Sequence, residues 1–177
     1  MHRLPLLLLL CVPLLGAWTW PVRGPVLAPF AFDPAHPYAG GQHRGVDVGA
    51  ADGAAVVAPA AGIVTFAGTV PSSGRSLTIL TADGYDVTLT HLGSLGVGKG
   101  AAVAEGDAVG TVGPSGTPEL DSPYVHLGVR TDANEQGYLD PLGFLPAPPR
   151  AAPAAVPPAP APASTSPAVE TTPAVTT

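Results

Sequence analysis

The fold class is decided by residues 75–90, which read Arg75-Ser76-Leu77-Thr78-Ile79-Leu80-Thr81-Ala82-Asp83-Gly84-Tyr85-Asp86-Val87-Thr88-Leu89-Thr90. Polar and apolar residues alternate on both sides of the centre, a pattern typical of strands buried on one face. The central Asp83-Gly84 pair supplies the positive φ angles that a tight hairpin turn needs. The stretch therefore predicts two antiparallel strands joined by a short turn.

Short strands of the same kind surround this hairpin. Apolar runs bounded by turn residues occur at 62–68, 107–112 and 124–130. No long stretch of the chain shows helical periodicity, so a helical or alternating α/β fold is not expected. We predict one all-β domain of antiparallel strands over about residues 20–146, a usual size for a single core.

The two ends of the chain have a different composition. Residues 1–17 begin with Met1-His2-Arg3, continue as a short apolar run and end on small residues, which predicts a signal peptide. An uncleaved anchor is the alternative. Cys11 is the only cysteine and would leave with the signal peptide, so the mature domain would have no disulfide or thiol chemistry. Residues 147–177 consist mainly of Pro, Ala and Thr and predict a disordered tail.

The charges give little indication of a nucleic-acid partner, because the formal net charge is −6 and the basic residues are scattered. His43-Arg44-Gly45-Val46-Asp47 places an imidazole and a carboxylate four residues apart, at a loop or strand entrance. His126 lies on a late strand, and its neighbours along the chain point to the opposite face. Two nitrogens and one oxygen would leave a fourth tetrahedral position for water, as a catalytic zinc site requires. The alternative is chance spacing and an ordinary half-buried strand histidine.

Several other polar residues carry weaker signals. Lys99 lies between two glycines, as the modified lysine of a biotinyl or lipoyl carrier domain would, although turn lysines are usually only solvated. Arg44 and Arg130 would each suit a substrate carboxylate, or be ordinary surface arginines. Ser72 and Ser115 lack a nucleophile-elbow context, so a serine hydrolase is not expected. His36 is expected to be solvated, and no role is predicted for Glu119 or Asp121.

Six sequence blocks follow one another in a recognisable order. The blocks are His43-Arg44-Gly45-Val46-Asp47, Val57-Ala58-Pro59 with Gly62–Gly68, Leu89-Thr90-His91-Leu92, Val103–Gly110, Gly113-Pro114-Ser115-Gly116 and Asp140-Pro141-Leu142. With these blocks, residues 20–145 resemble the lysostaphin-type (LytM-like) zinc endopeptidases of bacterial cell walls. The resemblance implies antiparallel sheets in a barrel-sandwich hybrid (duplicated hybrid motif) arrangement.

The resemblance also implies the roles of five residues. It implies Zn²⁺ held by His43, Asp47 and His126, and a catalytic role for His91. Where the family has a second catalytic histidine, this chain has Tyr124. Tyr124 and His126 are two residues apart on one strand and share a face, so the phenol would lie beside the metal. It would donate a hydrogen bond to the oxyanion of the reaction, bind substrate at the rim, or only fill space.

These features together predict the function. We expect a secreted or envelope-associated zinc metalloendopeptidase that hydrolyses amide bonds in peptidoglycan peptide stems or cross-bridges, acts as a monomer and has no nucleic-acid partner. The alternative is a catalytically impaired module that binds the wall or activates a partner hydrolase, because Tyr124 replaces a catalytic histidine.

Overall fold

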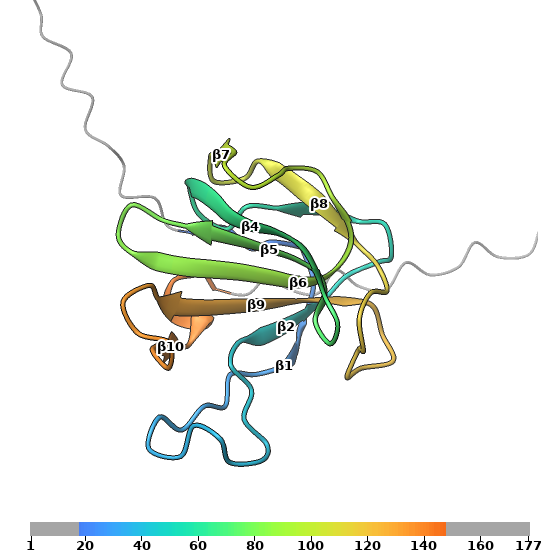
Figure 1. The fold of residues 1–177 in the computed structure, drawn as a ribbon. Helices are drawn as coiled ribbons and strands as arrows, with labels where there is room; N and C mark the ends of the chain where they lie inside the picture. Colours follow the sequence, from blue (N-terminus) through green and yellow to red (C-terminus); the bar gives the residue numbers. More distant parts are fainter. Residues whose placement is uncertain (1–17, 148–177) are drawn as a thin grey trace, which may run out of the picture.

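The computed structural model describes residues 18–147. The strands are β1 (Val26–Ala28), β2 (Val46–Gly49), β3 (Ala55–Val57), β4 (Gly62–Val70), β5 (Gly74–Leu80), β6 (Tyr85–Leu95), β7 (Ala102–Val103), β8 (Ala108–Val112), β9 (Tyr124–Thr131) and β10 (Tyr138–Leu139), followed by a 3-10 turn at Pro141–Gly143 (Figure 1). Among these residues, no helix is long and apolar enough to cross a membrane. The predicted signal peptide and nearly all of the predicted tail lie outside the described residues.

The strands that the sequence predicted are confirmed. The hairpin around Asp83-Gly84 joins β5 to β6. A positive φ was expected at both turn residues, but only Gly84 has one, at 80°, a value that suits a glycine. The other predicted strands correspond to β4, β8 and β9. The strand β2 begins within the His43–Asp47 block, where a loop or strand entrance was predicted. The strands β1, β3, β7 and β10 were not predicted, because two or three residues are too few to show an alternating pattern.

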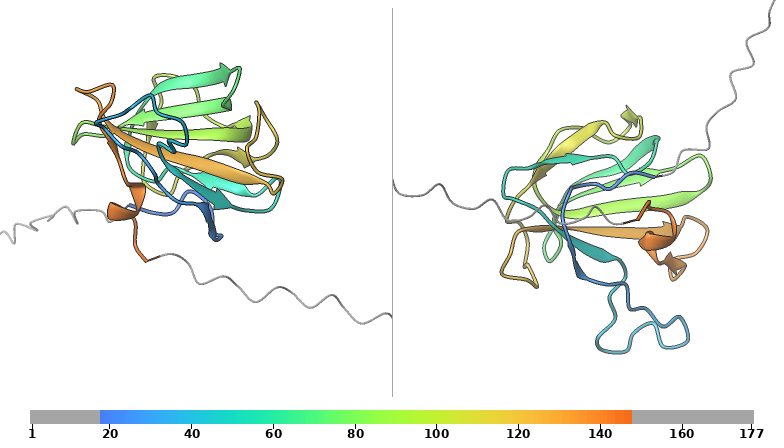
Figure 2. Two further views of the ribbon diagram at one scale, coloured as in Figure 1. Left: turned by 90° about the horizontal axis from the view of Figure 1, so that it is seen from below. Right: turned by 180° about the vertical axis from the view of Figure 1, so that it is seen from behind.

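The sheet is antiparallel throughout, as predicted. Its main path is β1-β2-β9-β6-β5-β4-β7, and β10 pairs with β9. The long strand β6 is shared, since Tyr85–Thr90 pairs with β9 while Leu92–Leu95 pairs with β8, which in turn pairs with β3. The sheet therefore bends back over itself without closing (Figures 1 and 2).

One apolar core lies inside this bend. On β9, Val125, Leu127 and Val129 are fully buried, and Val125 and Leu127 join residues of β3 and β8 in one cluster. The neighbouring positions of β9 face the other way because side chains alternate along a strand. One face of β6 and β9 is therefore committed to the core, and the opposite face is free to carry polar side chains.

A β-bulge interrupts this alternation in β6. Leu77 pairs with Leu89 and Arg75 pairs with Leu92, so β6 uses one residue more than β5 over this interval. The extra residue lets both Leu89 and Leu92 enter the core. His91 lies between them with a φ of 58°, the one positive φ of a non-glycine among residues 18–147. Bulges often redirect a side chain beside a functional site, and here the redirected side chain is an imidazole.

Candidate metal centre and active site

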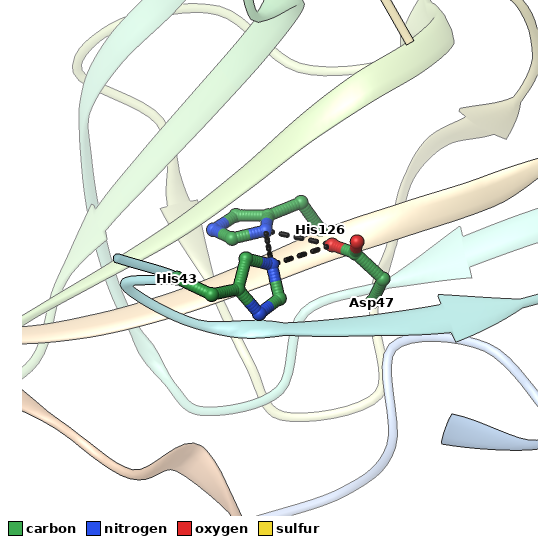
Figure 3. Close-up of side chains that lie close together, drawn as sticks. All are labelled: His43, Asp47 and His126. Atoms are coloured by element: carbon green, nitrogen blue, oxygen red, sulfur yellow. Dashed lines mark hydrogen bonds and ion pairs between the residues drawn. The ribbon is translucent and has the colours of Figure 1, made fainter. Parts of the chain in front are cut away.

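His43, Asp47 and His126 come together on the polar face of the sheet (Figure 3). His43 lies in the loop before β2, Asp47 on β2 and His126 on β9, where Asp47 and His126 are direct cross-strand partners. One potential ligand atom of each residue lies within 4.8 Å of the other two. The pairing of β2 with β9 thus brings the His43–Asp47 block next to His126, as the predicted metal site requires.

The chemistry of these three side chains fits a metal ion. His43 Nδ1 lies 2.7 Å from the carbonyl oxygen of Pro29, which can only accept, so this nitrogen carries the proton and Nε2 presents a lone pair. His43 Nε2 is 3.2 Å from both Asp47 Oδ1 and His126 Nδ1, and His126 Nδ1 is 2.8 Å from Asp47 Oδ1. These separations are close to the edge of about 3.3 Å that metal–ligand bonds of about 2.0 to 2.1 Å imply for a tetrahedral zinc site. A cation among them would relieve the repulsion between neighbouring lone pairs.

Gly45 explains the spacing of the early motif. A Cβ at this position would lie 2.3 Å from the carbonyl oxygen of Leu127 and 2.6 Å from Nε2 of His126. Only a residue without a side chain lets the segment between His43 and Asp47 pass this close to the His126 ring. In the sequence, Gly45 was noted only as a member of the His43–Asp47 block, and its steric role became visible in the structure.

A groove of about 400 Å³ lies over the three residues. It is also lined by His91 and Tyr124, so the five predicted site residues face one cavity. The polar faces of β6 and β9 form much of its lining, which includes Thr88, Thr90, Gly128 and Arg130. The arrangement can hold a cation and, beside it, an extended polar chain.

His91 is held with one ring nitrogen available. Its Nδ1 lies 3.0 Å from the carbonyl oxygen of Ser115 and therefore donates to it. The neutral ring then has its lone pair on Nε2, the atom that can accept a proton. The backbone N–H of His91 donates to the carbonyl of Ser73. Two separate loops therefore fix the imidazole in the bulge.

Ser115 is the central residue of this support. Besides accepting from His91, it donates its hydroxyl to the Leu92 carbonyl at 2.8 Å and accepts from the Arg75 N–H at 3.0 Å. The close approach also requires Gly74, where a Cβ would lie 2.2 Å from the Ser115 hydroxyl. In the sequence, Ser115 was considered only as a nucleophile and rejected as one. Its place in the Gly-x-Ser-Gly block was the available signal of another role.

Tyr124 is buried, with 4% of its surface exposed, and its ring centroid lies 5.0 Å from that of His91. Its hydroxyl oxygen accepts a hydrogen bond of 3.0 Å from the Glu119 N–H, so the hydroxyl hydrogen is free to donate elsewhere. Burial raises the pKa of the phenol, against a smaller lowering by this hydrogen bond, and the charges of Asp47 and Glu119 raise it further. Tyr124 therefore keeps its proton at neutral pH.

The two arginines considered in the sequence both line the groove but have protein partners. Arg130 donates to the Asp86 carboxylate at 2.5 Å. The guanidinium of Arg44 lies 5.4 Å from the ring centroid of Phe32 and 5.5 Å from that of Tyr138, and it donates to a backbone carbonyl. Asp86 was not among the predicted site residues, although the alternation of side chains along β6 places it on the groove face.

Several known proteins are similar to this chain in sequence. A sequence profile described as Peptidase family M23 matches residues 41–141. The chain is 30% identical over 116 residues to the cell division protein DipM of Caulobacter vibrioides, covering 65% of this chain and 18% of DipM. It is 29% identical over 133 residues to the murein hydrolase activator NlpD of Salmonella typhimurium, covering 75% of this chain and 32% of NlpD. The chain thus spans about a third or less of these two relatives.

The fold also matches solved structures. The catalytic domain of the antimicrobial peptidase lysostaphin from Staphylococcus simulans superposes with a TM-score of 0.57 at 25% identity, covering 68% of this chain and 89% of that domain. The family profile covers more than half of the 177 residues and includes all five residues of the candidate site. The chain therefore belongs to Peptidase family M23.

Proposed function

We propose that this domain is a zinc metalloendopeptidase that hydrolyses amide bonds in the peptides of peptidoglycan. The observation that carries the proposal is the convergence of two imidazole nitrogens and one carboxylate oxygen, beside His91, whose Nε2 has no hydrogen-bond partner among residues 18–147. Three protein ligands with an open fourth position are typical of catalytic rather than structural zinc sites. In this proposal His43, Asp47 and His126 hold the metal, which when bound supplies a Lewis acid and lowers the pKa of water.

His91 and Tyr124 would move and stabilise charge in this reaction. Nε2 of His91 would take a proton from the attacking water and pass it to the leaving amine. The Tyr124 hydroxyl would donate its free hydrogen to the oxygen of the tetrahedral intermediate, a contribution typically worth about a hundred- to a thousandfold in rate. The competing role for Tyr124 is structural, since its hydroxyl also holds the Glu119 amide.

The groove supports a peptide as the substrate. Its lining follows the polar face of β6 from Asp86 to His91 and that of β9 from Tyr124 to Arg130, where an extended chain can lie beside the strands. The predicted signal peptide and the wall-related names of the relatives support an envelope or extracellular location and a peptidoglycan substrate, with stems and cross-bridges as the candidate bonds. We propose that the domain acts as a monomer.

A second function is favoured by Tyr124 and by the NlpD relative, which is named as a murein hydrolase activator. In this alternative the domain binds the wall or a partner hydrolase and stimulates cleavage without cutting bonds itself. The complete ligand set favours the peptidase.

The deciding experiment incubates the zinc-loaded protein with purified wall material and measures the release of new amino groups. Wild type and the control His36→Ala should release them at equal rates, since His36 is exposed and lies outside the groove. His91→Ala should retain zinc and lose cleavage. If wild type binds zinc, releases nothing and yet accelerates a separate wall hydrolase, the activator is the correct reading. Unchanged turnover in Tyr124→Phe would remove only the oxyanion role.

A further inference from the structure

A second, smaller cavity adjoins the groove on the side of His91 and Tyr124. Its volume is about 180 Å³, whereas one water molecule takes about 30 Å³ in the liquid, so the cavity has room for a side chain. Most of its wall is apolar, and Pro118, Leu120 and Pro123 come from one loop, the segment 113–123. This cavity is not used by the hydrolysis described above.

The position of the cavity ties it to the reaction. His91 and Tyr124 line both the groove and the smaller cavity, and their ring centroids are 5.0 Å apart. These two rings are therefore the common wall. A substrate whose amide lies against His91 would place in the cavity the side chain of a residue next to that amide.

The cavity is held open by its own framework. The Tyr124 hydroxyl accepts from the Glu119 amide, the Thr117 N–H donates to the Ser72 carbonyl, and the Ser115 hydroxyl donates to the Leu92 carbonyl. These bonds fix the segment 113–123 at several points along its length. A preformed cavity binds a side chain without first having to order the loop.

The charged residues around the cavity indicate which kind of apolar side chain it would bind. Asp52 and Asp121 line it, and among residues 18–147 neither forms an ion pair and no lysine or arginine contributes to the lining. Asp52 lies at the wall itself, because a Cβ on Gly113 would be 3.1 Å from its Oδ1. The main groove differs, since Arg44 and Arg130 both line it. An apolar channel with carboxylates and no cation suits an alkyl chain that ends in an ammonium group.

We propose that this cavity is a specificity subsite for an aliphatic amine side chain, of lysine type, on the residue that adjoins the scissile amide. The proposal rests on the proposed function for the placement of the amide beside His91. The apolar wall would take the methylene groups, and Asp52 and Asp121 would bind the ammonium group.

The test measures binding of zinc-loaded full-length protein to peptides Ac-Ala-Ala-X-Ala-Ala-NH2, in which X is lysine, norleucine or glutamate of either configuration. Norleucine keeps the alkyl chain and removes the charge. We expect lysine to bind about fivefold more tightly than norleucine, because partly exposed ion pairs contribute modestly, and glutamate to bind most weakly. The preference should decline as salt is raised.

Two double variants distinguish binding at this subsite from an effect of the protein's net charge. Asp52→Asn with Asp121→Asn should abolish the preference for lysine over norleucine. Asp83→Asn with Glu105→Gln removes the same charge at turns outside both cavities and should leave the preference unchanged. Equal binding of lysine and norleucine peptides by wild type overturns the subsite, and this comparison needs no variant to fold.

Cleavage is measured on the same peptides to keep the two proposals apart. A preference for lysine in binding, together with no release of amino groups from purified wall material, keeps the subsite and discards the peptidase. Cleavage at equal rates with lysine and norleucine, together with equal binding, keeps the peptidase and discards the subsite.

Discussion

The two sides of the groove are built in different ways. On the metal side, Asp47 and His126 are neighbours across two paired strands, and their positions follow from the register of the sheet. On the other side, His91 stands in a β-bulge with a positive φ, and Tyr124 faces a loop that polar contacts hold in place. The metal side therefore depends on strand pairing, whereas the His91 side depends on a bulge and a loop.

This difference separates binding from catalysis. Changes on the metal side should remove zinc and stability together, because the ligands belong to the sheet. Changes on the His91 side should alter turnover while zinc stays bound. A change on the His91 side that released zinc, or a change of a metal ligand that left zinc affinity unaltered, would contradict this comparison.

The largest effect is expected from His126→Ala. Loss of one of three protein ligands should weaken zinc binding by more than about a hundredfold, since even the loss of an outer-shell partner costs up to about that much. Competition with a chromophoric zinc chelator measures the affinity, with His36→Ala as the control. Retention of wild-type affinity by His126→Ala would place the metal elsewhere.

The next largest effect is expected from Gly45→Ala. The added Cβ meets the Leu127 carbonyl and the His126 ring, so unfolding free energy should fall by about 1 to 3 kcal/mol, the usual cost of overpacking, and zinc affinity should fall with it. Gly40→Ala is the matched control, because a Cβ there meets nothing within 4 Å. Urea titration and chelator competition give the two readouts, and equal behaviour of the two alanine variants would refute the steric role.

On the other side, Ser115→Ala should lower stability by about 1 to 2 kcal/mol, because it removes hydroxyl bonds to Leu92 and Arg75. It should also lower turnover with zinc affinity unchanged, since His91 loses its fixed neighbour. Ser72→Ala, in the same region, serves as the control. The prediction is wrong if zinc affinity falls as much as turnover.

His91→Gly and His91→Ala should differ by about 1 kcal/mol in stability. Both remove the imidazole, but only alanine keeps a Cβ at a φ of 58°, so glycine should be the more stable variant. Thermal or urea unfolding at neutral pH measures the difference. Equal stabilities would mean that the bulge relaxes when the imidazole is gone.

The smallest effect is the pH dependence of Tyr124→Phe. Its lost hydrogen bond should cost about 1 kcal/mol at pH 8. Because the pKa of Tyr124 is raised above its ordinary value of 10.0, the folded protein holds the phenol proton more tightly than the unfolded chain does. Wild type should therefore lose stability relative to the variant as the pH rises above 10.0. Urea titrations between pH 8 and 11 test this, and a constant difference would contradict the raised pKa.

The sequence was sufficient for the parts of the fold that repeat a simple rule. Alternation and the Asp83-Gly84 turn predicted the long strands, and the resemblance in motif order predicted that His43, Asp47 and His126 lie together. It was insufficient where one backbone carbonyl or one close approach decides the geometry. The His91–Ser115 bond and the steric need for Gly45 depend on segments that meet only in three dimensions.

The direct pairing of Asp47 with His126 has a consequence for the durability of the fold. These side chains are separated by 79 positions along the chain, and residues 18–147 contain no cysteine. A metal bound by both would close a long loop and act as a removable cross-link, as a disulfide does in many secreted proteins. Chelation would then loosen the contact between β2 and β9, and amide hydrogen exchange in these two strands would report it.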